Sequence, residues 1–142
     1  MKPLLIGLLA LALGGCATVH QEVTASGKPE ATVRAPPTAV KSYIVNKMTN
    51  DGFTLDNDTS YRLSFGRLGR QPIVQPTWGY RVNYLITEQD GGTRVVADMA
   101  LVTNLGKLGE SPFPSNFNQP TDPQEAVYQQ IRQILAGLNT LH

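Results

Sequence analysis

The chain has 142 residues, of which 41% are hydrophobic and 16% are charged; this length and balance suit one compact domain and exclude an intrinsically disordered protein. Twelve lysines and arginines oppose eleven aspartates and glutamates, so the chain has no strong positive field with which to gather nucleic acid. The one cysteine excludes an internal disulfide and a thiolate-rich metal site.

The first fifteen residues have the organisation of a bacterial export signal. Lys2 supplies a positive charge, and the apolar run 4–13 is shorter than the roughly 20 residues of a membrane-spanning helix. The run ends in Leu13-Gly14-Gly15-Cys16, which resembles the lipobox of bacterial lipoproteins. An ordinary secretory signal that happens to contain a cysteine is the alternative, and the position of the chain's only cysteine favours the lipobox.

The resemblance to lipoproteins implies a lipid anchor on Cys16. In that family the cysteine thiol takes a diacylglycerol and signal peptidase II cuts immediately before it, which makes residues 1–15 a signal peptide. Ala17, rather than an aspartate, comes next, and this resembles lipoproteins that enteric bacteria sort to the outer membrane. We therefore expect the protein at the cell outer membrane, on its periplasmic face, held by more than one acyl chain.

Residues 16–37 are predicted to form a flexible tether between the lipid and the domain. The segment has no apolar period, is rich in small polar residues and carries Pro29 and the Pro36-Pro37 pair, a composition typical of linkers. Stretched at about 3 Å per residue, it would hold the domain roughly 60 Å from the bilayer. The domain itself is predicted over 38–142.

Two helices are predicted, one at each end of the domain. The first is expected over 38–50, with Thr38 as its cap and Gly52 in a left-handed conformation beyond its end. The second is expected to begin near residue 121. Each should bury the apolar positions that recur every three or four residues. These are Val40, Tyr43, Ile44 and Met48 in the first helix and Val127, Ile131, Ile134, Leu135 and Leu138 in the second.

Four strands are predicted between the helices. A short strand begins at Phe53, and alternating apolar and polar residues predict further strands over 61–66, 78–86 and 95–101. Asp90-Gly91-Gly92 supplies the hairpin turn between the last two strands. One sheet face should then carry Trp78, Tyr80, Val82, Tyr84, Val95, Ala97, Met99 and Leu101.

The expected fold class is α+β, with two layers. One antiparallel four-stranded sheet carries an N-terminal and a C-terminal helix on its apolar face, in the order α-β-β-β-β-α. Over 38–140 this order, together with the run from the first helix through Asp51-Gly52-Phe53 into strands, resembles the helix-grip domains of envelope lipoproteins such as BamC, a component of the outer-membrane barrel-assembly machinery. The resemblance implies the same two-layer arrangement.

The sequence contains no recognisable catalytic set. The two histidines, His20 and His142, lie in the tether and at the C-terminus, which leaves none for a catalytic triad within the domain. The remaining catalytic alternative is a pair of carboxylates that cleaves a glycan, drawn from Asp51, Asp56 and Asp58, although turns commonly collect such residues. We therefore expect no enzyme activity, no metal and no cofactor.

Three arginines form the first candidate binding surface. Arg62, Arg81 and Arg94 share the strand parity opposite the apolar face, and would together suit a carboxylate or phosphate partner in peptidoglycan or lipopolysaccharide. The alternative is the ordinary solvated face of a half-buried sheet. Arg67 and Arg70 are placed in the loop that follows the strand 61–66.

Two phenylalanines form the second candidate surface. Phe113 and Phe117 fall in a proline-stiffened loop predicted over 104–120. Exposed aromatic side chains make good interface anchors, so the pair would insert into a groove of a partner. The alternative is that both rings fold back over the open end of the core.

The function expected from these features is that of a membrane-anchored, non-catalytic envelope lipoprotein. It would act as an accessory or scaffold through contacts with another envelope protein, and it would not bind nucleic acid. The alternative is a periplasm-facing carrier or sensor of a small hydrophobic or lipid ligand. These two functions differ in whether the face of Trp78, Tyr80 and Tyr84 is packed solid or hollow.

Overall fold

The computed structural model of the chain describes residues 21–69, 78–105, 109–114 and 122–141. The predicted signal peptide and the Leu13-Gly14-Gly15-Cys16 motif lie outside the described residues. The elements, in chain order, are β1 (Gln21–Val23), β2 (Pro29–Val33), α1 (Pro37–Asn50), β3 (Thr54–Asp58), β4 (Arg62–Leu68), β5 (Trp78–Gln89), β6 (Gly92–Thr103), β7 (Ser111–Pro114), α2 (Asp122–Gly137) and the short 3-10 helix η1 (Leu138–Thr140).

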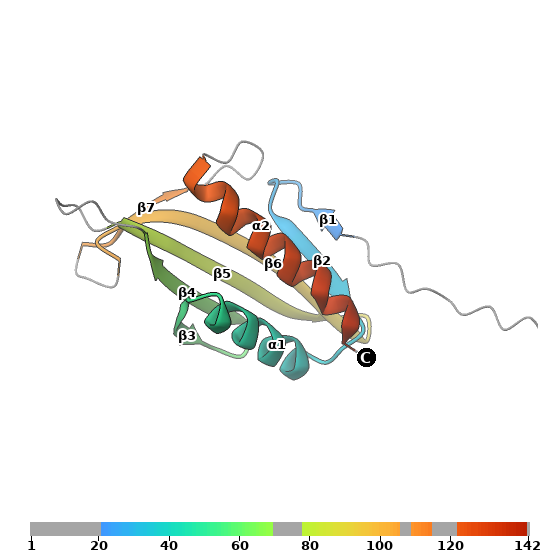
Figure 1. Cartoon of the computed structure of the whole chain (residues 1–142). Coiled ribbons are helices and arrows are strands. Elements are labelled where there is room, and N and C mark those ends of the chain that lie inside the picture. The colour runs from blue at the N-terminus through green and yellow to red at the C-terminus, as the bar shows by residue number, and fades with distance from the viewer. Residues whose placement is uncertain (1–20, 70–77, 106–108, 115–121, 142) are drawn as a thin grey trace, which may run out of the picture.

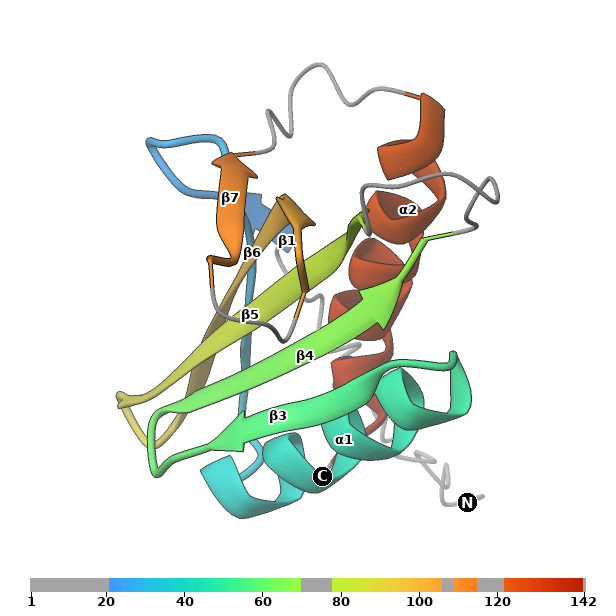
Figure 2. The same cartoon turned by 90° about the vertical axis from the view of Figure 1, so that its left-hand side faces the viewer.

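All the strands belong to one antiparallel sheet, and both helices lie on the same side of it (Figure 1, Figure 2). The strand order is β1-β2-β6-β5-β4-β3, with β7 paired to β6. The α+β class and the antiparallel sheet are thus confirmed. The predicted count of four strands and the order α-β-β-β-β-α are wrong, since the described residues form seven strands, two of which precede α1. We call the side that carries the helices the helix face and the other side the open face.

The hairpin of β5 and β6 is the longest pairing in the sheet. The two strands are in register from Trp78 opposite Thr103 to Gln89 opposite Gly92. Asp90 and Gly91 connect them with φ angles of 48° and 74°, and two positive φ values are the requirement of the tight hairpin turn that matches strand twist. The predicted hairpin is confirmed, and the residues predicted for its apolar face lie on the helix face.

The second half of the predicted tether is wrong, because it belongs to the sheet. β1 pairs with β2, and β2 pairs with β6 through Glu30–Val33. Ala31 and Val33 are buried in the core, as the alternation of a strand requires. This alternation extends over only the five residues of β2. The Thr93 hydroxyl donates a buried hydrogen bond to the carbonyl of Ala35 at 2.7 Å, which ties the link between β2 and α1 to β6.

A second unpredicted strand, β7, lies within the predicted loop 104–120. It pairs with β6 from Thr103 opposite Ser111 to Ala100 opposite Pro114. Two of its four residues are prolines, which cannot donate to a strand ladder and are tolerated in sheets at edge strands. β7 occupies such a place, because among the described strands it pairs with β6 alone.

Helix α1 follows the predicted range but begins differently. Pro36 stands at the cap position without a side-chain hydrogen bond, and Pro37 opens the helix, where its missing N–H costs nothing; the predicted cap at Thr38 is therefore wrong. At the other end Gly52 has φ +84°. The Gly52 N–H donates to the carbonyl of Thr49 at 3.1 Å, and the Phe53 N–H donates to the carbonyl of Met48 at 3.0 Å. This pair of hydrogen bonds is the Schellman motif.

The core lies between the helix face and the two helices. α1 buries Val40, Ile44 and Met48 there. Helix α2 begins where predicted, and every apolar position expected of it is buried, as are most of those expected on β5 and β6. Trp78 and Leu101 are only partly buried and pack against the edge of this core. The predicted two-layer packing is therefore what the described residues adopt.

Candidate functional site

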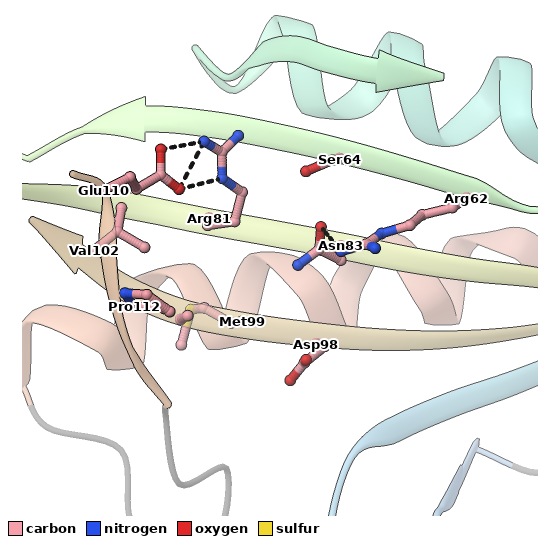
Figure 3. A pocket seen from close by; sticks show the side chains of 10 residues that line it. Arg62, Ser64, Arg81, Asn83, Asp98, Met99, Val102, Glu110 and Pro112 are labelled. Carbon is pink, nitrogen blue, oxygen red and sulfur yellow. Dashed lines mark hydrogen bonds and ion pairs between the residues drawn. The ribbon is translucent and has the colours of Figure 1, made fainter. Parts of the chain in front are cut away.

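The open face carries a depression of about 500 Å³ on β4, β5 and β6, bounded at one end by the segment before β7 (Figure 3). Two of the predicted arginines line it, Arg62 from β4 and Arg81 from β5. Its floor is formed around Ser64 and Asn83, which face each other across the β4–β5 pair. The depression is thus lined mainly by polar groups that strand alternation directs away from the core.

Arg81 closes one end of the depression through a bidentate ion pair. Its Nη2 donates to both carboxylate oxygens of Glu110, at 2.9 and 2.7 Å, and its Nε donates at 3.1 Å. Nη1 donates to Asp56. The hydrogen bond to Glu110 raises the pKa of Arg81, although burial opposes it. A guanidinium bound in this way is a fixed structural cation with two carboxylates already in place.

The local sequence explains how Asp56 reaches Arg81. Leu55 pairs with Phe65 and Asn57 with Ser64, so Asp56 is the extra residue of a β-bulge in β3. Its carboxylate lies over Gly66, where an added Cβ would stand 2.7 Å from Oδ2. The glycine therefore leaves the space that the Asp56–Arg81 pair occupies.

Arg62 lies at the other end of the depression and has no carboxylate within ion-pair distance among the described residues. Its Nη2 donates to the side-chain oxygen of Asn83 at 3.0 Å. The face around it is nearly balanced in charge, because Arg94 pairs with Glu30 and Lys28 pairs with Asp98 at 3.1 Å. The predicted three-arginine surface therefore has carboxylate partners at two of its members.

The remaining predicted site residues are placed as follows. Phe113 lies in β7, where its backbone is paired with Leu101. Phe117, Cys16, His20 and His142 lie outside the described residues.

The described residues do not supply an obvious catalytic or metal centre. Asp56 is bound to Arg81 and Asp58 to Lys41, so two of the three aspartates considered for glycan cleavage are held in ion pairs. Within the described ranges no group of three or more histidine, cysteine, aspartate or glutamate side chains could hold a metal ion. The polar groups that line the depression on the open face can therefore offer hydrogen bonds to a partner.

The aromatic row of the helix face is solid at its centre and hollow at one end. Tyr84 is fully buried, contacts Phe65 edge to face at 6.1 Å and donates to the sulfur of Met48 at 3.4 Å. Trp78 is only partly buried and lines a cleft of about 610 Å³ between the paired ends of β4 and β5 and helix α2. The face of Trp78, Tyr80 and Tyr84 is thus packed solid at Tyr84 and borders a cleft at Trp78.

Arg67 is the site residue that the sequence analysis placed incorrectly. It was predicted in a loop, whereas β4 continues through Leu68 and pairs Arg67 with Tyr80. Leu63 and Phe65 have the same strand parity and are buried, so Arg67 lies on the helix face. Extending the period-two pattern past Gly66 would have found it.

Comparison with known proteins adds no family to these observations: no protein-family model and no curated protein matches the chain. In the described part of the chain, no helix is both long enough and apolar enough to cross a membrane.

Proposed function

We propose that this chain is a lipid-anchored lipoprotein of the bacterial outer membrane whose domain acts without catalysis, by docking on another envelope protein. The observation that carries the anchor is the sequence Leu13-Gly14-Gly15-Cys16, which places the chain's only cysteine directly after a short apolar export signal. A lipid on Cys16 accounts for both features at once, whereas an ordinary signal peptide gives the cysteine no role.

The open face is the surface proposed to dock. Both helices of the described residues lie on the helix face (Figure 2), and the open face presents Leu85 with 43% of its area exposed, opposite Val96. Around this apolar centre lie the polar groups of the depression and its ion pairs. An apolar centre within a polar, charge-balanced rim is the usual composition of a protein–protein interface.

A protein partner is favoured over peptidoglycan or lipopolysaccharide. Recognition of those polymers through their carboxylates or phosphates would use arginines able to form new bidentate pairs. Arg81 and Arg94 are already engaged by Glu110, Asp56 and Glu30. Only Arg62 of the three would meet an anion without first releasing a carboxylate, which is a weak basis for holding a polyanion.

The anchor is tested by metabolic labelling of cells with an alkyne fatty acid. We expect the wild-type protein to take the label and to sediment with the outer membrane, and Cys16→Ser to take none and to leave the membrane fraction. An unlabelled wild-type protein, or a labelled Cys16→Ser variant, would contradict the anchor.

The docking surface is tested by placing a photo-crosslinking amino acid at Asn83, within the depression, in intact cells. The matched control carries it at Gln133, an exposed position of α2. We expect a discrete crosslinked protein from position 83, none from position 133, and loss of the product in the Cys16→Ser background. Equal products from both positions, or none from position 83, would refute docking through the open face.

A further inference from the structure

Arg67 is a charged residue at a position that the strand pattern assigns to the core. It continues the parity of buried Leu63 and Phe65 on β4, and its side chain lies against aromatic rings. Its guanidinium carbon is 4.2 Å from the ring centroid of Phe53 and 5.8 Å from that of Tyr80. Such stacking holds a guanidinium in a partly dry place by attraction to the ring faces.

The hydrogen bonds of Arg67 that the structure shows go to neutral acceptors. Nη1 donates to the carbonyl of Asp51 at 3.1 Å and to the amide oxygen of Gln130 at 3.4 Å. Both acceptors are neutral, and no carboxylate lies within ion-pair distance of Arg67 among the described residues. Burial lowers the pKa of Arg67, although the nearby charge of Asp51 opposes this shift, as expected of a partly buried cation without an ion-pair partner at close range.

The cleft beside Arg67 combines this cation with apolar walls. It has a volume of about 610 Å³, which is within the range of small-molecule sites. Trp78 stands in it, edge to face with Tyr80 at 5.5 Å. Leu68 and Gly69 of the β4 end and Ala126 of α2 complete the apolar part of the lining, and Gln130 adds an amide. Apolar walls with a few fixed polar groups are the usual composition of a ligand site.

We propose that this cleft binds a small organic carboxylate, with the carboxylate paired to Arg67 and an aliphatic or aromatic body lying against Trp78. One guanidinium in a partly dry site is neutralised by one negative charge, and its planar fork matches the two oxygens of a carboxylate. A multiply charged anion would leave charge unpaired in the cleft, which is costly. The site goes beyond the proposed docking function, since it lies on the helix face.

Trp78 provides the readout, because it is the chain's only tryptophan and it lines the cleft. The test titrates the mature chain from residue 16, carrying Cys16→Ser and free of detergent, with octanoate and with octanamide, which has the same body and no charge. We expect a saturable change of Trp78 emission with octanoate. Octanamide should bind at least about tenfold more weakly, which corresponds to one charge-assisted pair of about 1.4 kcal/mol or more.

Two arginine variants on the same strand separate a binding role from a structural one. Arg67→Met should weaken octanoate about tenfold or more and remove the preference over octanamide. Arg62→Met, on the open face of β4, should bind octanoate as the wild type does. Arg67→Lys retains the charge without the fork and should give an intermediate affinity; it also serves if Arg67→Met fails to fold, as judged by circular dichroism.

Two results would overturn the proposal. The first is the lack of a saturable response to octanoate in both Trp78 emission and titration calorimetry. The second is an Arg67→Met or Arg67→Lys protein that is folded and binds octanoate as tightly as the wild type, since Arg67 would then only cover the core by stacking on Phe53 and Tyr80. Neither result bears on the lipid anchor or on crosslinking from the open face, so this site and the proposed docking function fail separately.

Discussion

Two pairs of aromatic rings on β4 and β5 have the same mutual geometry but different surroundings. Phe65 and Tyr84 meet edge to face with an interplanar angle of 85°, and Trp78 and Tyr80 meet at 84°. The first pair is fully buried, and Met48 of α1 fills the space above it. Beside Trp78, helix α2 presents Ala126 and Gln130. The ring pairs alone do not decide whether the core is solid; the size and polarity of the helix residues opposite them do.

The largest expected effect comes from removing a ring at the solid centre. Phe65→Ala should lower the free energy of unfolding by about 3–5 kcal/mol, because the lost contacts leave a cavity that neighbours fill only partly. Trp78→Ala removes a larger side chain from the open end, yet should cost at most about half as much, because a partly exposed ring loses less transfer energy. Urea unfolding followed by circular dichroism measures both variants.

The order of these two losses is the decisive result. Equal losses would mean that Trp78 is packed as firmly as Phe65, and the contrast between the two ends would be wrong. If Trp78→Ala lowered the free energy of unfolding more than Phe65→Ala, the end of the sheet at Trp78 would be the more firmly packed of the two.

A smaller effect is expected from alkaline pH, which reports on the same two ends through Tyr84 and Tyr80. Burial raises the pKa of both tyrosines. An unfolded tyrosine loses its proton near pH 10, so above that pH the unfolded state binds fewer protons than the folded state. The free energy of unfolding should therefore be insensitive to these groups below about pH 9 and fall by up to about 1.4 kcal/mol per pH unit for each group above pH 10.

Tyr84→Phe and Tyr80→Phe separate the two contributions in urea unfolding between pH 8 and pH 11. Tyr84→Phe should flatten the alkaline fall more than Tyr80→Phe, because Tyr84 is enclosed whereas Tyr80 borders the cleft and Arg67. If the three proteins lose stability in parallel, the tyrosines are not the cause of the fall.

The smallest effect is expected from Gly69→Ala at the open end. A Cβ there would stand 2.3 Å from Cζ3 of Trp78, so the ring must swing away, and a partly exposed ring can do so at a cost below about 1 kcal/mol. We expect a shifted emission maximum of Trp78 with nearly unchanged stability.

Gly79→Ala is the matched comparison, since its Cβ would meet the backbone oxygen of Arg67 at 2.6 Å. Backbone cannot swing aside as a ring can, so this variant should cost more than Gly69→Ala, about 1–3 kcal/mol. An unchanged emission from Gly69→Ala would show that Trp78 already lies elsewhere.

The helices and the β5–β6 hairpin could be predicted because each carries its own periodic signal. The C-terminal helix repeats apolar residues over about three turns, from Val127 to Leu138, and the hairpin has alternating strands joined by Asp90-Gly91. β2 could not be recognised, because it has five residues, begins with Pro29 and buries a residue as small as Ala31. The composition that suggested a linker is tolerated there because β6 supplies the hydrogen bonds.

The candidate sites depend on the register in which neighbouring strands pair, and this register could not be predicted from the sequence. Arg81 meets Asp56, 25 residues earlier, and Glu110, 29 residues later. The first pairing needs a bulge in β3 and the second needs the segment leading into β7, a strand with two prolines that was predicted as loop. Arg67 differs, since its parity with Leu63 and Phe65 was present in the sequence and Gly66 concealed it.

The incorporation of β1 and β2 into the sheet changes the geometry of the proposed membrane attachment. Only four residues lie between Cys16 and Gln21, where β1 begins, and the five Cα–Cα steps from Cys16 to Gln21 span about 18 Å at most when fully extended. A lipid on Cys16 would therefore hold the domain close to the bilayer, with the β1 edge of the sheet toward the membrane. The β3 edge, at the opposite end of the strand order, would lie farthest from the membrane. Such a domain searches for partners in two dimensions, among molecules that are themselves at the membrane surface.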